Sequence, residues 1–249
     1  MGAGRIADAG SAEVTGDGTR RIFGGSTAEL AEFPRAVALL DRYWAARCSG
    51  AAVAPHWVLT AAHCVTPRLA YVKYNTRRPA SLDGDFAPVH YLYRHPKYVL
   101  SYGSLTYFHG PRLVRHDVPC ALCRFKVVQT EGAAADVTLL HHDVGLVRTR
   151  DVMRLHAALP LDIHAELRRY DPSDLNDEEV QVLGFGRTER SVLGEELCGA
   201  RLRLAACGRG EWVHVVCGAV RGAARGVCSG DSGGPVLYRD QQVGVTSMG

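Results

Sequence analysis

Short apolar runs recur along most of the chain, separated by turn-forming Gly, Pro and Asp. Many runs are rich in Val, Leu and Tyr, whereas stretches with the spacing of an amphipathic helix are scarce. The runs that we expect to form strands are 35–40, 56–62, 70–74, 89–93, 143–149, 180–186, 212–217 and 235–238. Regularly spaced short strands of this kind are typical of an all-β sandwich or barrel.

Two parts of the chain depart from this pattern. Residues 1–21 are mostly small or polar, end in two arginines and are predicted to form a flexible leader. Residues 99–128 lack a clean alternation and hold Cys120 and Cys123 in a Cys-x-x-Cys arrangement. Because no second ligand pair lies at the spacing of a zinc site, the sequence predicts no metal.

Composition and charge exclude some classes of function without selecting one. The 249 residues are enough for one large or two small domains, and a net charge of +3 is too small to favour nucleic-acid binding. No apolar run approaches the roughly 20 residues of a membrane-spanning helix. The N-terminus lacks the apolar stretch of a secretory signal, which favours a cytosolic start, whereas eight cysteines favour an oxidising compartment. These two indications disagree, and both stay open here.

Ser232, in the stretch GDSGG, is a candidate nucleophile. A serine hydroxyl reacts poorly near neutral pH unless a base, usually His, lies beside it and a buried carboxylate orients that base. Taken alone, a serine among glycines is more often a turn residue. Upstream, however, His63 directly follows one apolar run and Asp143 heads another. The sequence therefore offers a nucleophile, a base and a carboxylate.

The carboxylate has a second candidate. Asp117 repeats the His-Asp-Val pattern found at Asp143. We favour Asp143 because it heads an alternating apolar run, whereas Asp117 is closely followed by Pro119, which interrupts strand pairing.

Five motifs, in this order, resemble the chymotrypsin/trypsin family of serine endopeptidases. They are RIFGGSTAELAEFP at the activation site, CSGAAVAPHWVLTAAHC at the base, VQVLGFGR at the start of the second barrel, CSGDSGGPV at the nucleophile and GVTSMG at the substrate pocket. The resemblance implies an all-β fold of two packed antiparallel Greek-key barrels, the second incomplete, with the active site between them. The implied parts are a leader (1–21), an N-terminal barrel with an unusual insertion near 99–128 (22–158) and a truncated C-terminal barrel (159–249).

The resemblance also implies a role for each catalytic residue. Ser232 attacks the scissile carbonyl, and His63 accepts the serine proton and returns it to the leaving amine. Asp143 holds the imidazolium, and the backbone N–H groups of Gly230 and Ser232 form the oxyanion hole.

Activation is implied to proceed by cleavage. A cut after Arg21 frees the α-amino group of Ile22, which inserts and pairs with Asp231. Because a buried charge is costly unless it is paired, this pairing orders the oxyanion loop only after cleavage. We therefore expect a zymogen.

The substrate pocket is implied to include Gly226, Ser247 and Gly249. In the family the residue at the position of Gly226 lies at the base of the pocket, and an Asp there selects Arg or Lys. Glycine offers no charge to a buried cation, so we expect a preference for apolar P1 residues. The alternative is that Gly226 is only a permissive loop residue and a residue further downstream sets specificity.

The resemblance implies two disulfides, Cys48–Cys64 and Cys207–Cys217, and leaves Cys198 and Cys228 without an evident partner. Three features depart from the family. The signal peptide is missing, the chain stops inside the pocket region, and residues 99–128 lengthen the interval between His63 and Asp143. One hypothesis is an incomplete or misassembled gene product with 99–128 translated from an intron. The alternative is a genuine long surface loop.

The function expected from these observations is hydrolysis of peptide bonds by a secreted serine endopeptidase. We expect protein or peptide substrates, an activating protease and protein protease inhibitors as partners, no cofactor, no nucleic acid, no membrane and a monomeric state. Two alternatives are a non-catalytic homologue that binds or regulates and a cytosolic structural β-protein.

Overall fold

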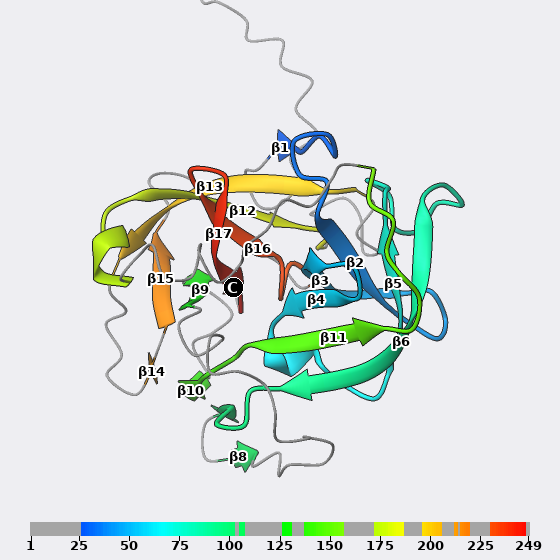
Figure 1. The fold of residues 1–249 in the computed structure, drawn as a ribbon. Coiled ribbons are helices and arrows are strands. Elements are labelled where there is room, and N and C mark those ends of the chain that lie inside the picture. The colour runs from blue at the N-terminus through cyan, green and yellow to red at the C-terminus, as the bar shows by residue number, and fades with distance from the viewer. Residues whose placement is uncertain are drawn as a thin grey trace, which may run out of the picture.

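The computed structural model describes residues 26–102, 105–107, 126–130, 137–156, 172–186, 196–205, 212–213, 215–219 and 230–247. Six antiparallel strands close into a barrel in the order β11-β4-β3-β2-β5-β6 (Figure 1). They are β2 (Ala36–Asp41), β3 (Ala46–Ala54), β4 (Trp57–Thr60), β5 (Leu69–Tyr74), β6 (Asp85–Arg94) and β11 (Gly145–Thr149).

Strand β2 packs against both halves of the molecule. Every residue of β2 is buried, so both of its faces are covered. Because side chains alternate along a strand, Val37 and Leu39 fill the core of the closed barrel. Ala38 and Leu40 face the other way and pack with Phe185 from the second half of the chain. The continuous apolar run of β2 thus reflects burial on two sides.

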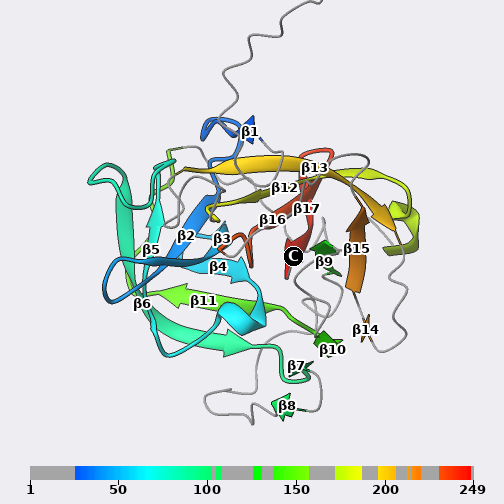
Figure 2. The same cartoon turned by 180° about the vertical axis from the view of Figure 1, so that it is seen from behind.

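A second sheet has the order β1-β13-β12-β16-β17-β9-β15, and β15 also pairs with β13. Figure 2 shows this sheet beside the closed barrel from behind. Its strands are β1 (Ser26–Thr27), β9 (Lys126–Thr130), β12 (Glu179–Gly184), β13 (Cys198–Ala205), β15 (Val215–Ala219), β16 (Pro235–Tyr238) and β17 (Gln241–Thr246). Its own core consists of alternate residues of β12, β13 and β16, with Leu175 and Val243 packed alongside. The all-β, two-barrel class predicted from the sequence is confirmed, and the incomplete C-terminal part stays a prediction.

Strand β9 begins inside the segment 99–128 and was not predicted. It lies between β17 and β15 and runs parallel to both. The remaining strands form a small sheet in the order β14-β10-β7-β8. They are β7 (Val99–Tyr102), β8 (Leu105–Tyr107), β10 (Val137–His141) and β14 (Trp212–Val213). The segment 99–128 therefore contributes strands to two sheets.

Helical structure in the described part of the chain is limited to two 3₁₀ turns, Ala62–Cys64 and Pro172–Leu175. None of the helices described is long and apolar enough to cross a membrane.

The structure contains the Cys48–Cys64 disulfide that the resemblance implied. Cys217 is also disulfide-bonded, to a cysteine outside the described residues, so the Cys207–Cys217 bridge stays a prediction. Cys198 is buried at the start of β13.

Candidate active site

His63 and Asp143 come together because of the register between β4 and β11. These strands are antiparallel, with Gly145 opposite Thr60. The residues just after β4 and those just before β11 therefore lie at the same end of the barrel. His63 lies in the 3₁₀ turn that follows β4, and Asp143 lies two residues before β11.

Gly145 allows this approach. A Cβ atom at this position would lie 2.6 Å from a methyl group of Val65 and 2.9 Å from the carbonyl oxygen of Tyr93. Strand β11 can therefore lie close to the 3₁₀ turn that carries His63 only because residue 145 has no side chain.

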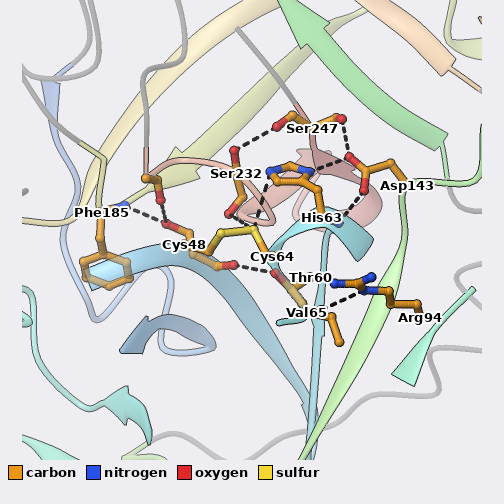
Figure 3. Close-up of a disulfide and its surroundings, with 12 residues drawn as sticks. Cys48, Thr60, His63, Cys64, Val65, Arg94, Asp143, Phe185, Ser232 and Ser247 are labelled. Carbon is orange, nitrogen blue, oxygen red and sulfur yellow. Dashed lines mark hydrogen bonds and ion pairs between the residues drawn. A yellow bond between two sulfur atoms is a disulfide. The ribbon is translucent and has the colours of Figure 1, made fainter. Parts of the chain in front are cut away.

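Two hydrogen bonds join His63 to Asp143 (Figure 3). Nδ1 of the imidazole lies 2.7 Å from Oδ2 of Asp143, and the backbone N–H of His63 donates to Oδ1 at 2.8 Å. Asp143 is fully buried, whereas the His63 side chain is 23% exposed. The carboxylate is thus fixed from two directions, while the imidazole stays partly exposed to solvent.

The pKa values of the pair shift in opposite directions. Burial lowers the pKa of His63, but the charge of Asp143 and the hydrogen bond to it more than offset this, so the pKa lies above 6.5. Burial raises the pKa of Asp143, but the charge of His63 and hydrogen bonds from His63 and Ser247 bring it below 3.8. Asp143 is therefore ionised near neutral pH and only accepts, so the shared proton is on Nδ1 and neutral His63 presents its lone pair on Nε2.

Ser232 lies in the loop just before β16 of the second sheet. Figure 3 shows the His63 ring between Ser232 and Asp143. The Ser232 hydroxyl donates to the carbonyl oxygen of Ser247 at 2.9 Å. This hydroxyl must turn from Ser247 toward Nε2 of His63 before it can transfer a proton. Catalytic hydrogen bonds are often formed only once substrate is bound.

Ser247 makes a contact that the sequence did not predict. The resemblance implies a place in the substrate pocket, which stays a prediction. In the structure its hydroxyl donates to Oδ2 of Asp143 at 2.5 Å, and its side chain is completely buried. Ser247 therefore contacts both Asp143 and Ser232, through its hydroxyl and its carbonyl. The only signal in the sequence is its place directly after the strand in GVTSMG.

The loop around Ser232 is tightly folded. Gly230 and Gly233 have φ angles of 104° and 81°, a region that residues with side chains rarely adopt. The N–H of Gly233 donates to the carbonyl of Thr246 at 2.6 Å, and the N–H of Ser49 donates to the carbonyl of Ser232 at 2.8 Å. The loop is thereby attached to β17 on one side and to β3 on the other.

The carboxylate of Asp231 lies against the backbone near the end of β12. Asp231 is 1% exposed, and its Oδ1 accepts the N–H of Gly186 at 2.8 Å. A Cβ atom at position 184 or 186, where the chain has Gly184 and Gly186, would overlap this carboxylate. The two glycines thus form a close-fitting backbone site for Asp231.

Several residues singled out in the sequence lie outside the described residues. They are Arg21, Ile22, Asp117, Cys120, Cys123, Cys207, Gly226, Cys228 and Gly249. Cys48, His63 and Cys64 bring possible metal-ligating atoms within 4.8 Å of one another. Both sulfurs belong to the disulfide, so no thiolate is left in this group to bind a metal.

Comparison with known proteins gives consistent matches along the chain. The family model described as Trypsin matches residues 22–104 and 125–249. Rat tonin is 26% identical over 98% of this chain and 85% of its own length. Human kallikrein-2 is 24% identical over 92% of this chain and 79% of its own length. Serine protease SP24D of Anopheles gambiae is 28% identical over 92% of this chain and 71% of its own length. The two parts of the family match are separated by residues 105–124, which lie within the segment 99–128.

Proposed function

The chain belongs to the trypsin family of serine endopeptidases, and on that premise we propose that Ser232, His63 and Asp143 form its catalytic triad. The observation that carries this proposal is the buried Asp143, joined to His63 by two hydrogen bonds, beside the serine of the GDSGG loop. As a hydrolase of this family, the protein acts on protein substrates.

In the proposed mechanism Ser232 Oγ forms a bond to the scissile carbonyl carbon while its proton passes to Nε2 of His63. Asp143 stabilises the imidazolium, and the N–H groups of Gly230 and Ser232 stabilise the oxyanion. The carbon–nitrogen bond then breaks as His63 gives the proton to the leaving amine. Water, deprotonated by His63, hydrolyses the acyl-enzyme and restores the Ser232 hydroxyl.

We further propose that cleavage after Arg21 activates the chain, through pairing of the new amino group of Ile22 with Asp231. The support is the burial of Asp231, since a carboxylate that is 1% exposed is stabilised by a positive partner. Asp231 also precedes Ser232 directly, so its position governs the neighbouring loop.

Cleavage of the chain after Arg21 is expected to raise kcat/KM for peptide hydrolysis about 100-fold or more, because cleavage orders the oxyanion hole. The Arg21→Gln variant, treated with the same activating protease, is expected to remain uncut. Its kcat/KM is expected to stay at the level of the uncut wild-type chain. The measurement pairs amino-terminal sequencing with hydrolysis rates before and after treatment. Equal activities of the cut and uncut wild-type chains would contradict the proposal.

We propose that the active enzyme prefers apolar P1 residues, because Gly226 supplies no charge for Arg or Lys. The test uses substrates that differ only in the P1 residue. Substrates with Phe, Leu or Ala at P1 are expected to have a kcat/KM about tenfold or more above that of the substrate with Arg. The cleaved enzyme is assayed against each substrate. A wide preference for Arg would instead favour the alternative that a different residue sets specificity.

The remaining proposals concern the compartment, the activating protease, the oligomeric state and the domain division of the enzyme. We propose that it works outside the cell, because the Cys48–Cys64 disulfide is stable in an oxidising compartment. An activating protease, a monomeric state and the division into residues 1–21, 22–158 and 159–249 are proposed with it.

A further inference from the structure

The side chain of Ser49, in β3 of the first barrel, is hydrogen-bonded to the loop that precedes Ser232. Its hydroxyl donates to the carbonyl oxygen of Gly230 at 2.8 Å and accepts the N–H of Phe185 at 2.9 Å. Ser49 itself is 1% exposed. One buried hydroxyl therefore connects three backbone segments that are far apart in the sequence.

Only a hydroxyl can make this connection with so small a side chain. The oxygen of Ser49 must accept one hydrogen bond and donate another, which a serine does at once. Alanine would leave the N–H of Phe185 and the carbonyl of Gly230 without this partner. A buried backbone group that loses its hydrogen-bond partner lowers the stability of the folded state.

Ser49 is itself firmly held. Its backbone carbonyl accepts the hydroxyl of Thr60 at 2.8 Å, and its backbone N–H donates to the carbonyl of Ser232. The preceding residue, Cys48, is disulfide-bonded to Cys64, the neighbour of His63. The hydroxyl of Ser49 is thus placed relative to both the nucleophile and the base.

Fixing the carbonyl of Gly230 also constrains its N–H. The two groups flank one Cα atom and are separated only by the rotations ψ and φ of Gly230, so an anchored carbonyl keeps the Cα atom and the attached N–H near their place. That φ is 104°, a value that glycine adopts freely, so the backbone at Gly230 supplies little restraint of its own. The hydrogen bond from Ser49 holds the carbonyl end of Gly230 in place and thereby limits how far its N–H can move.

We infer that Ser49 is a positioning residue of the oxyanion hole, which keeps the N–H of Gly230 directed at the developing oxyanion. This inference rests on the proposed function, because it takes Gly230 as an oxyanion donor and Ser232 as the nucleophile. Ser49 touches neither substrate nor reacting atoms, and it acts through the backbone of Gly230.

Ser49→Ala, in the full chain cleaved after Arg21, is expected to lower kcat about 10- to 100-fold while KM stays within about twofold. Rates are expressed per active site titrated with a fluorophosphonate, so that misfolded protein is not counted. A peptide boronic acid forms a tetrahedral adduct on Ser232, and its inhibition constant should rise by a similar factor. The matching peptide amide, which forms no adduct, should bind as before.

Two further variants separate positioning from folding. Thr149→Val removes the hydroxyl of another residue that is 1% exposed; this hydroxyl donates to the backbone carbonyl of Asp151. It is expected to lower the melting temperature without changing kcat. Ser49→Thr keeps the hydroxyl and is expected to keep kcat within about threefold of wild type, since a β-branched residue suits a strand.

The outcomes distinguish the two proposals. If Ser49→Ala keeps full kcat and boronic acid affinity while Ser232→Ala is inactive, Ser49 has no positioning role and the triad stands. If Ser49→Ala and the Thr149 variant lose kcat equally, the role of Ser49 is structural only. If Ser232→Ala remains active, the proposed function itself fails.

Discussion

Replacing Ser232 with alanine is expected to reduce kcat for peptide hydrolysis by the cleaved chain about 10⁵- to 10⁶-fold. Without the hydroxyl no acyl-enzyme can form, and His63 and Asp143 have no nucleophile to activate. Because the backbone N–H groups of the loop are unchanged, substrate binding should be retained, with KM close to that of wild type. Steady-state rates measured on one peptide substrate test both parts.

A matched control for this variant is Ser81→Ala. The hydroxyl of Ser81 donates to the carbonyl of Arg78 in the β5–β6 connection, outside the candidate site. Its removal should leave kcat unchanged. Substantial hydrolysis by purified Ser232→Ala protein would mean that another residue is the nucleophile.

The second large effect is expected for Asp143→Asn, with kcat about 10⁴-fold lower near neutral pH. An amide in place of the carboxylate neither stabilises the imidazolium nor holds the proton on Nδ1 of His63. The variant should also change the pH profile. In wild type the pKa of His63 is raised above 6.5, so kcat/KM rises with pH through a midpoint above that value. In the variant, burial remains and the charge is gone, so this midpoint moves to lower pH.

Asp117→Asn is the control for that experiment, because Asp117 follows a histidine and precedes a valine as Asp143 does. Its activity and its acidic midpoint should match those of wild type. If Asp117→Asn loses activity and Asp143→Asn does not, the carboxylate has been assigned to the wrong residue.

Strands with strong apolar patterns could be predicted from the sequence, whereas those fixed by distant neighbours could not. The run 235–238 matches β16, and 35–40 matches β2 within one residue. Strand β3 has the sequence ARCSGAAVA, rich in small residues with weak strand preference, and was missed. It forms because β2 and β4 pair with it on either side.

Strand β9 was missed for a related reason. Its sequence KVVQT lies at the end of a segment with no clean alternation. Its partners, β17 and β15, come more than eighty residues later in the chain. Pairing between segments so far apart leaves no local pattern in the sequence.

The candidate site shows the same division. His63, Asp143 and Ser232 could be found because each has neighbours that resemble a known motif. The contacts of Ser247 with Asp143 and of Ser49 with Gly230 could not, because each joins the two halves of the fold. A serine beside a strand gives no indication of which buried group it will meet.

The most direct test of a working Ser232–His63–Asp143 triad is mass spectrometry of the cleaved chain after treatment with a fluorophosphonate. The triad predicts one adduct, on the peptide that contains Ser232. It also predicts that the rate of labelling falls at least about 10³-fold in His63→Ala, because the serine then lacks its base. An unlabelled Ser232, an adduct on a different residue, or labelling at the wild-type rate in His63→Ala would contradict it.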